Sequence, residues 1–421
     1  MDQARADILA ARHQLEARGW IARSSENFRN LPPPAAEVWL GNEAASAPAA
    51  CESSALSGAG WTLQPIGDGP HGLVDAHWLD AADATQRAEL LAGLPAPGSA
   101  SGGVPDDAAP FGWAHRALCR QGLRLRVGTA AGSTRHAARK VSLALRHQPR
   151  SAVEAPLLVL DIAPGTHCVL VETHEREPSN CQQAIVQNLQ IHIHLGAGAT
   201  LQHLRSVTPE PGDRIAHHLN VRIGRGARFE QATIASGSAY QLHRHVLALE
   251  DRGAFARSAG LLFAAGDAIE QQVLVAHDAP QTTSDVEMLA LACGSARAVL
   301  NARTRIAPGA AEADVRQRLS GIPTAGQPKL IVRPHLEILH DQVQAVHGAT
   351  WGAMPEDEIF YARQRGLDEH TARSLIIDGM ARALIQRCFG DDAALEALGA
   401  EAPLHAAAAR HLRVAEETAR G

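Results

Sequence analysis

The sequence predicts a mainly β protein, a right-handed parallel β-helix with an N-terminal helical region and a C-terminal helical domain. From Leu118 onward, short strands of five to eight residues are separated by Gly-Ala turns. Three of these turns, at Gly198, Gly226 and Gly253, follow one another at intervals of 28 and 27 residues, and such a period is typical of a repeat fold. The composition, 45% hydrophobic but 4% aromatic, suits ladders of aliphatic side chains.

The N-terminal region, residues 1–110, is expected to begin with a helix that extends to about residue 30. Its first twenty residues form an amphipathic pattern that carries Asp2, Asp7 and Glu16. These acidic residues argue against both a secretory signal and a transit peptide, so we expect a cytoplasmic protein. The stretch 95–110 is rich in Pro, Gly, Ser and Asp and predicts a loop or linker at the end of this region.

Residues 111–353 are expected to form the β-helix core. Segments such as LRLRVG, LLVLDI, CVLVETH and LQIHIHLG are too short to bury an apolar surface alone, so neighbouring units must stack. Short strands without intervening helices stack naturally as a β-helix. Because the sequence indicates strands better than their pairing, an antiparallel sandwich remains an alternative.

Residues 354–421 are expected to form the helical domain. Pro355 and the acidic residues after it suit the start of a helix, and Gly366 suits its end. Asp368 can cap a second helix. The apolar or small residues of that helix predict a buried stripe made of Ala372, Leu375, Ile376, Gly379, Met380, Ala383 and Leu384.

Composition and motifs exclude several classes of function. The net charge of −6, with basic residues spread throughout, gives no footprint for nucleic acid, and no apolar run approaches the ~18 residues of a membrane span. The six cysteines form no CxxC pair, so we interpret them as reduced and structural. The chain contains no GxxxxGK[ST] loop, so any ATP dependence must come from another subunit.

Two histidine pairs, His192/His194 and His243/His245, have the i, i+2 spacing that places both rings on one face of a strand. Either pair could bind a metal. Neither pair has a recognisable third ligand, so we interpret them as packed or solvated side chains.

Several motifs together resemble a known family. Pro334 with Leu336-Glu337-Ile338, His347-Gly348-Ala349-Thr350 with Gly352, and a helix containing Phe360 and Tyr361 appear in order near the C-terminal end. This order is similar to the SufD branch of the SufB/SufD family, which acts in the SUF system of iron-sulfur cluster assembly. Upstream, the pattern around His277 and the region ending at Gln317 also resemble that family.

The resemblance implies a non-enzymatic scaffold subunit of a SufBCD complex. Its β-helix would pair with that of SufB, and its C-terminal helices would dock the ATPase SufC through residues matching the family's helix motif: Phe360, Tyr361, Arg363, Arg365 and Gly366. A homodimer in the absence of SufB is also consistent with the resemblance. No cofactor is expected to bind this chain tightly by itself, and iron or an iron-sulfur cluster would bind only transiently at the SufB interface.

His347, with Gly348, Ala349 and Thr350, is the expected site of cluster assembly. Imidazole can be neutral near pH 7, so it can ligate iron or relay a proton, and the small residues beside it leave space for a partner. The family's cysteine two residues earlier is replaced by Ala345. Two alternatives remain, a SufB-like main cluster scaffold and a β-helix enzyme that acts on polysaccharide.

Overall fold

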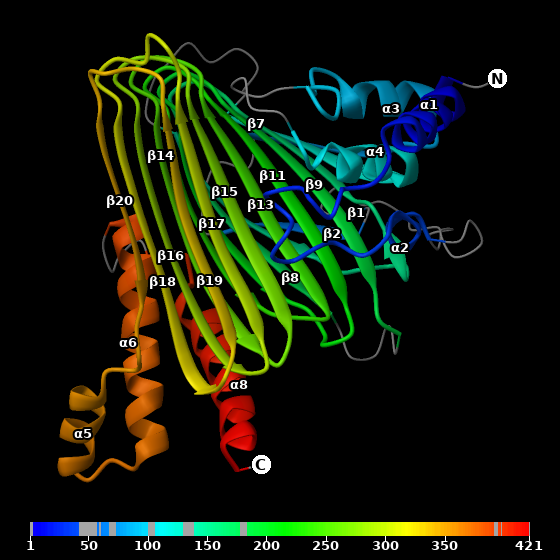
Figure 1. Cartoon of the computed structure of the whole chain (residues 1–421). Helices are drawn as coiled ribbons and strands as arrows, with labels where there is room; N and C mark the ends of the chain where they lie inside the picture. Colours follow the sequence, from blue (N-terminus) through cyan, green and yellow to red (C-terminus); the bar gives the residue numbers. More distant parts are fainter. Residues whose placement is uncertain are drawn as a thin grey trace.

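Two long β-sheets face each other along most of the protein (Figure 1). The computed structural model describes residues 3–41, 57–58, 60–66, 73–99, 106–128, 139–176, 183–390, 395–396 and 398–420. In spatial order, the first sheet contains β1 (Ser57–Gly58), β2 (Trp61–Pro65), β5 (Arg139–His147), β8 (Thr166–Glu175), β10 (Thr200–Thr208), β12 (Arg228–Ser236), β14 (Phe255–Ala265), β16 (Thr283–Gly294), β18 (Asp314–Gly326) and β20 (Gln344–Trp351).

The second sheet alternates with the first along the chain. Its spatial order is β19 (Lys329–Ile338), β17 (Arg297–Ile306), β15 (Ala268–His277), β13 (Tyr240–Leu249), β11 (Arg214–Ile223), β9 (Val186–Leu195), β7 (Leu157–Ile162), β4 (Gln121–Val127) and β3 (Val74–Asp80), with β6 (Val153–Glu154) beside β9.

The strands from β4 to β20 pair with one another in parallel, and successive strands alternate between the two sheets except for β6 and β7, which both lie in the second sheet. This arrangement is a parallel β-solenoid, so the predicted β-helix is confirmed and the antiparallel sandwich is wrong. Among the described strands, antiparallel ladders join β1 with β2, β2 with β5 and β3 with β4, and a single antiparallel bridge joins Ser238 to Ala268. Among the described residues from 120 to 350 there is no helix.

The Gly-Ala period marks stacked turns of the solenoid. Gly198, Gly226 and Gly253 have φ angles of 67°, 60° and 72°, a left-handed conformation that suits glycine. The N–H of Gly198 donates to the carbonyl of Arg225 at 2.8 Å, which joins one turn to the next. The alanine after each glycine is almost completely buried, because it closes the end of the core.

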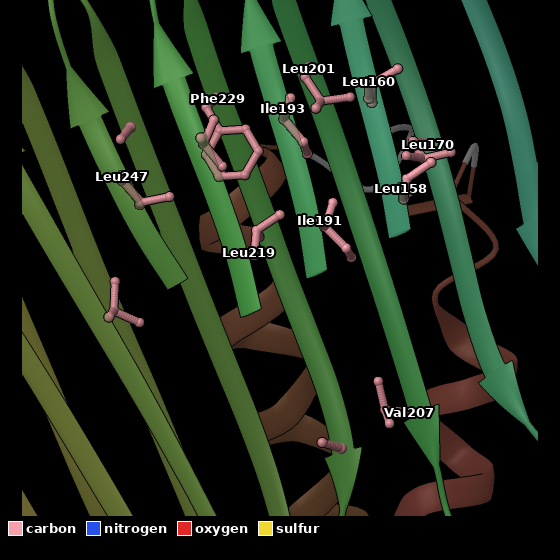
Figure 2. Packing of buried hydrophobic residues seen from close by; sticks show 14 of the residues in the cluster. Leu158, Leu160, Leu170, Ile191, Ile193, Leu201, Val207, Leu219, Phe229 and Leu247 are labelled. Carbon is pink, nitrogen blue, oxygen red and sulfur yellow. The ribbon is translucent and has the colours of Figure 1, made fainter. Parts of the chain in front are cut away.

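Aliphatic ladders fill the space between the sheets (Figure 2). Leu160 of β7, Ile193 of β9, Val221 of β11 and Leu247 of β13 lie in register on successive strands and are at most 2% exposed. Burial of each such side chain contributes about 1.5–3 kcal/mol to stability. The low aromatic content of the sequence therefore corresponds to a core of stacked Leu, Ile, Val and Ala.

In the described part of the N-terminal region, four helices form a helical unit: α1 (Gln3–Arg18), α2 (Ala36–Leu40), α3 (Ala84–Leu91) and α4 (Ala109–Leu118). The expected helix to about residue 30 is too long, because Gly19 takes a φ of 77° and the chain then enters a series of turns. Helix α4 packs against the second sheet, where Asn188 donates to the carbonyl of Phe111 at 2.8 Å. The division expected between residues 110 and 111 falls inside α4, and it remains a prediction.

The C-terminal helices are α5 (Glu356–Gln364), α6 (Glu369–Phe389) and α8 (Glu401–Arg420). Helices α6 and α8 pack along the outer face of the first sheet, whereas α5 projects beyond it (Figure 1). Asp368 caps α6 as expected, accepting from the N–H of Thr371 at 2.8 Å. The predicted stripe of α6 is partly wrong, because Leu375 and Gly379 are exposed and the buried face also includes Ile377, Ala381, Ile385 and Cys388.

Within the described part of the chain, no helix combines the length and the apolar character needed to cross a membrane.

Candidate functional site

The last turn of the solenoid, β19 with β20, ends both sheets. Strand β20 pairs with β18 and strand β19 pairs with β17, and among the described residues the other edge of each strand has no partner. An open strand edge presents unpaired backbone N–H and C=O groups, which form a template for pairing with another chain. The end of the solenoid is therefore the natural place for a second protein to bind.

His347 lies in the inward-facing row of this last turn. Val315, Gln317 and Leu319 of β18 are buried inward positions, and they lie in register with Ala345, His347 and Ala349 of β20. Because no further turn stacks on β20, His347 is exposed although it occupies a core position of the repeat. The imidazole therefore lies at the open mouth of the interior, and no hydrogen bond to it is present within the described residues.

The residues around His347 leave room beside it. A Cβ atom added to Gly348 would meet no atom within 4 Å, so this chain alone imposes no need for glycine there. Ala349 packs against the end of the core, and the Thr350 hydroxyl lies 2.8 Å from that of Ser320 on the neighbouring strand. Gly348 and Thr350 are exposed. Small exposed residues next to an imidazole suit contact with a partner surface.

Large apolar side chains are also exposed on the last turn. Ile338, Leu339, Val346 and Trp351 are 45%, 46%, 68% and 64% exposed. Trp351 lies in register with Gly321, a buried position of β18, whereas Val346 lies in register with Arg316 on the outer face, so the exposed apolar residues flank the open edge on both faces. Exposed apolar clusters of this kind mark interaction surfaces.

The predicted docking residues lie on α5 and in the turn that follows it. Phe360 and Tyr361 are 64% and 58% exposed, whereas Ile359 faces inward. The Arg365 guanidinium lies 4.5 Å from the centre of the Tyr361 ring, and Arg363 lies 3.5 Å from Glu369 of α6. Gly366 has a φ of 87° and its N–H donates to the carbonyl of Arg363, which places it in the turn that closes α5.

The two histidine pairs differ in environment. His243 and His245 are completely buried inside the solenoid, whereas on the outer face of β9 His194 is exposed and His192 is partly covered. Burial lowers the pKa of His192 to about 4, so its ring is neutral near pH 7. Among the described residues, no group of three or more His, Cys, Asp or Glu side chains could hold a metal ion.

Four of the cysteines, Cys119, Cys168, Cys293 and Cys388, are free thiols and buried. Burial raises the pKa of the Cys293 thiol to about 11, so it is protonated at neutral pH. Cys51 and Cys181 lie outside the described residues.

A charged network in the solenoid interior was missed by sequence reasoning. Glu172 of β8 accepts from His203 Nε2 at 2.8 Å and from Arg205 Nε and Nη2 at 3.1 Å each, and it also contacts His174. Burial would raise the pKa of Glu172, but Arg205 and the two histidines outweigh burial and hold that pKa well below its usual value. His217 and Gln187 extend the network.

A signal for this network is present in the sequence. Glu172 and His174, and likewise His203 and Arg205, are i, i+2 pairs within apolar strands. The two pairs belong to strands β8 and β10, which pair in parallel, with Glu172 directly opposite Arg205. Recognising the network required this register as well as the spacing.

Comparisons with known proteins agree with this architecture. A family model described as "SUF system FeS cluster assembly, SufBD core domain" matches residues 146–380. The chain is 23% identical over 247 residues to an iron-sulfur cluster assembly SufBD family protein of Synechocystis, covering 57% of this chain and 54% of that protein. It is 23% identical over 228 residues to the iron-sulfur cluster assembly protein SufD of Escherichia coli, covering 54% and 53%.

A third similarity, to the chloroplastic protein ABCI7 of Arabidopsis thaliana, is 28% over 97 residues and covers 23% of this chain and 20% of that protein. The chain spans about half the length of the first two relatives. The family model, however, extends from the end of β5 to α6 and includes His347 and the α5 residues. Because that match covers more than half of the 421 residues, this chain belongs to the SufBD family of SUF iron-sulfur cluster assembly proteins.

Proposed function

We propose that this chain is a SufD-like scaffold subunit without catalytic activity of its own. It pairs with SufB through the open end of its solenoid, and its C-terminal helices dock the ATPase SufC. The similarity to a protein named SufD and the family membership support this proposal. We further propose a cytoplasmic location. No tightly bound cofactor is part of the proposal, and iron or a nascent cluster is the cargo.

The observation that carries the proposal is the exposed inner row of the last turn. Ala349 and the apolar residues of β19 are built to face another layer of the repeat, yet no layer follows them. A second solenoid that pairs with β20 would satisfy the free backbone groups and cover Val346 and Trp351 at once. SufB, with a solenoid of the same family, is the partner of matching shape.

His347 would then act where the two solenoids meet. Its imidazole nitrogen suits iron, or it can accept and release a proton near neutral pH. Ala345, two positions earlier in the same row, supplies no thiolate. The remaining ligands of a cluster assembled there must therefore come from the partner.

SufC docking is proposed for the α5–α6 hairpin. Phe360 and Tyr361 together present two exposed rings on a helix that projects beyond the sheets, and Leu367 and Leu375 are exposed on the same hairpin. Aromatic side chains held on a rigid helix are frequent anchors of protein interfaces. Binding of an ATPase at this position would leave the open end of the solenoid free for SufB.

Co-expression of the tagged chain with SufB and SufC tests the proposal. We expect all three proteins to elute together after affinity purification, and failure to retain SufB would overturn it. The SufB-like alternative predicts instead that the chain alone holds a reconstituted cluster through gel filtration. Family membership leaves the polysaccharide-enzyme alternative without support.

A further inference from the structure

A cavity of about 120 Å³ separates the N-terminal helical unit from the outer face of the second sheet. Its roof is made by the segment 91–99 and by α4, and its floor by outward-facing side chains of β9, β11, β13, β15 and β17. For comparison, an apolar cavity of about 150 Å³ is enough to bind benzene. The present space is somewhat smaller and opens to solvent, so a small organic molecule would be partly enclosed in it. It lies outside the solenoid, and no residue of β19 or β20 lines it.

The floor changes from apolar to basic along one row of the sheet. Val246, Leu274 and Arg303 lie in register on β13, β15 and β17, so about 10 Å separates the first from the last. Arg305 follows in the next row, in register with Ala276. On the roof, Leu91 and Leu94 add apolar surface. A molecule lying along this row would have an apolar body at one end and guanidinium groups at the other.

The arginines of the basic end are partly paired with carboxylates, and Arg305 lies 3.8 Å from both Asp278 and Glu337. Arg303 Nη2 lies 3.1 Å from Glu337, but its Nε is buried and has no hydrogen-bond partner within the described residues. That Nε has no accessible surface, but 27% of the Arg303 side chain is exposed, so the rest of the guanidinium can donate to an oxygen in the cavity. Asp106 is the one carboxylate among the described lining residues, and Arg244, at 3.2 Å, engages it.

The histidines of the cavity add no charge of their own. Burial lowers the pKa of His115 to about 3, that of His192 to about 4 and that of His218 well below its ordinary value. Near pH 7 all three rings are neutral, and His218 Nε2 is buried without a partner in the described structure. Neutral rings can hydrogen-bond a ligand without repelling or attracting its charge.

We propose that this cavity binds a small organic carboxylate, with its apolar body against Val246 and Leu274 and its carboxylate on Arg303. A planar carboxylate matches the guanidinium geometry, and the row length matches a body the size of one aromatic ring. The site is independent of the proposed SufB and SufC contacts, because it uses neither β20 nor α5.

The test uses benzoate as the probe and benzyl alcohol as its neutral counterpart, each titrated into the full chain by saturation-transfer NMR. We expect saturable benzoate binding with a Kd between about 10 µM and 10 mM, and benzyl alcohol binding at least about tenfold more weakly. Absence of saturable benzoate binding, or equal affinity for the two probes, would overturn the proposal.

Three variants locate the site. Arg303→Gln should weaken benzoate about tenfold while changing benzyl alcohol about twofold or less. The matched control Arg222→Gln removes an exposed arginine of β11 that does not line the cavity, and it should change neither affinity. Leu274→Trp should fill the cavity and abolish binding of both probes.

Equal effects of Arg303→Gln and Arg222→Gln on benzoate binding would contradict the assignment of the site. Thermal melts of each variant exclude unfolding as the cause of any loss of binding.

Discussion

At the scale of single residues, His347 is the position where the repeat and the proposed function meet. It faces the interior of the solenoid and lies in register with the buried Gln317 of β18, yet its side chain is exposed. An exposed imidazole contributes little to the stability of the solenoid. Its chemistry is therefore available for a partner or for iron.

Replacing His347 by Ala should leave the complex with SufB and SufC assembled but reduce cluster production about tenfold or more, because a ligand or proton relay is lost from the open site. The matched control is His335→Ala, which removes an exposed imidazole from β19, in register with Arg303 on the outer face of the second sheet. The measurement is cluster-enzyme activity in cells that rely on this pathway. Normal output from an intact His347→Ala complex would show that this residue has no part in assembly.

Glu172 is the residue on which the interior network depends. Glu172→Gln should lower the free energy of unfolding by about 3–5 kcal/mol, because it leaves the buried Arg205 charge without its partner. Glu250→Gln, which breaks an exposed pair with Arg222, should cost less than about 1 kcal/mol. Urea unfolding measures both, and equal losses would mean that the interior pair adds nothing to stability.

The site could be predicted from the sequence only in part. His347 and the α5 residues follow from short motifs that are contiguous in the chain, and their roles remain predictions. The Glu172–Arg205 pair joins residues 33 positions apart, and the cavity joins Leu94 to Arg303. Such sites depend on strand register and on the docking of α4, which single-sequence patterns do not specify.

At the scale of elements, the turns were easier to predict than the helix faces. The Gly-Ala turns require a left-handed residue at each corner, so their signal is local. The buried face of α6 depends on how the helix lies across β12, β14 and β16, and the apolar periodicity alone placed Leu375 on the wrong side. An exposed Leu375 instead extends the apolar surface of the α5–α6 hairpin.

The α5–α6 hairpin is the predicted docking site for SufC. The double variant Phe360→Ala/Tyr361→Ala should weaken SufC binding at least about tenfold, because exposed aromatic anchors on a rigid helix often dominate an interface. The solenoid should stay folded, since α5 lies beyond the sheets. Co-purified SufC is quantified against SufB, with Leu9→Ala on α1 as the exposed control. Unchanged SufC recovery would show that SufC does not dock on these two residues.

At the scale of the whole molecule, the interior histidines predict an acid-sensitive fold. Burial lowers the pKa values of His147, His174, His203, His217, His243 and His245, so these rings are neutral in the folded state. Below pH ~6.5 the unfolded chain binds protons that the folded chain does not, and stability therefore falls as pH falls. Each proton taken up on unfolding contributes about 1.4 kcal/mol per pH unit.

Three buried carboxyls act in the opposite direction. Burial raises the pKa of Asp267 to about 6, that of Glu154 to about 7 and that of Glu270 to about 8. Their contribution to the stability of the fold is therefore lost as the pH rises from about 4 through these values. The six histidines outnumber them, and we expect a lower urea midpoint at pH 5.5 than at pH 7.5. A midpoint that is equal or higher at pH 5.5 would show that the interior rings are charged or solvated.

The central claim is that the open last turn pairs with a second SufBD solenoid, and an edge-blocking variant tests it most directly. Val346→Lys places a charge on the exposed edge strand, where lysine discourages pairing, and the 68% exposure of Val346 means that folding is preserved. Leu9→Lys on α1 is the control. The measurement is the SufB-to-chain ratio after affinity purification of the co-expressed complex. The account predicts that Val346→Lys loses SufB while Leu9→Lys retains it, and full retention of SufB by folded Val346→Lys would contradict it.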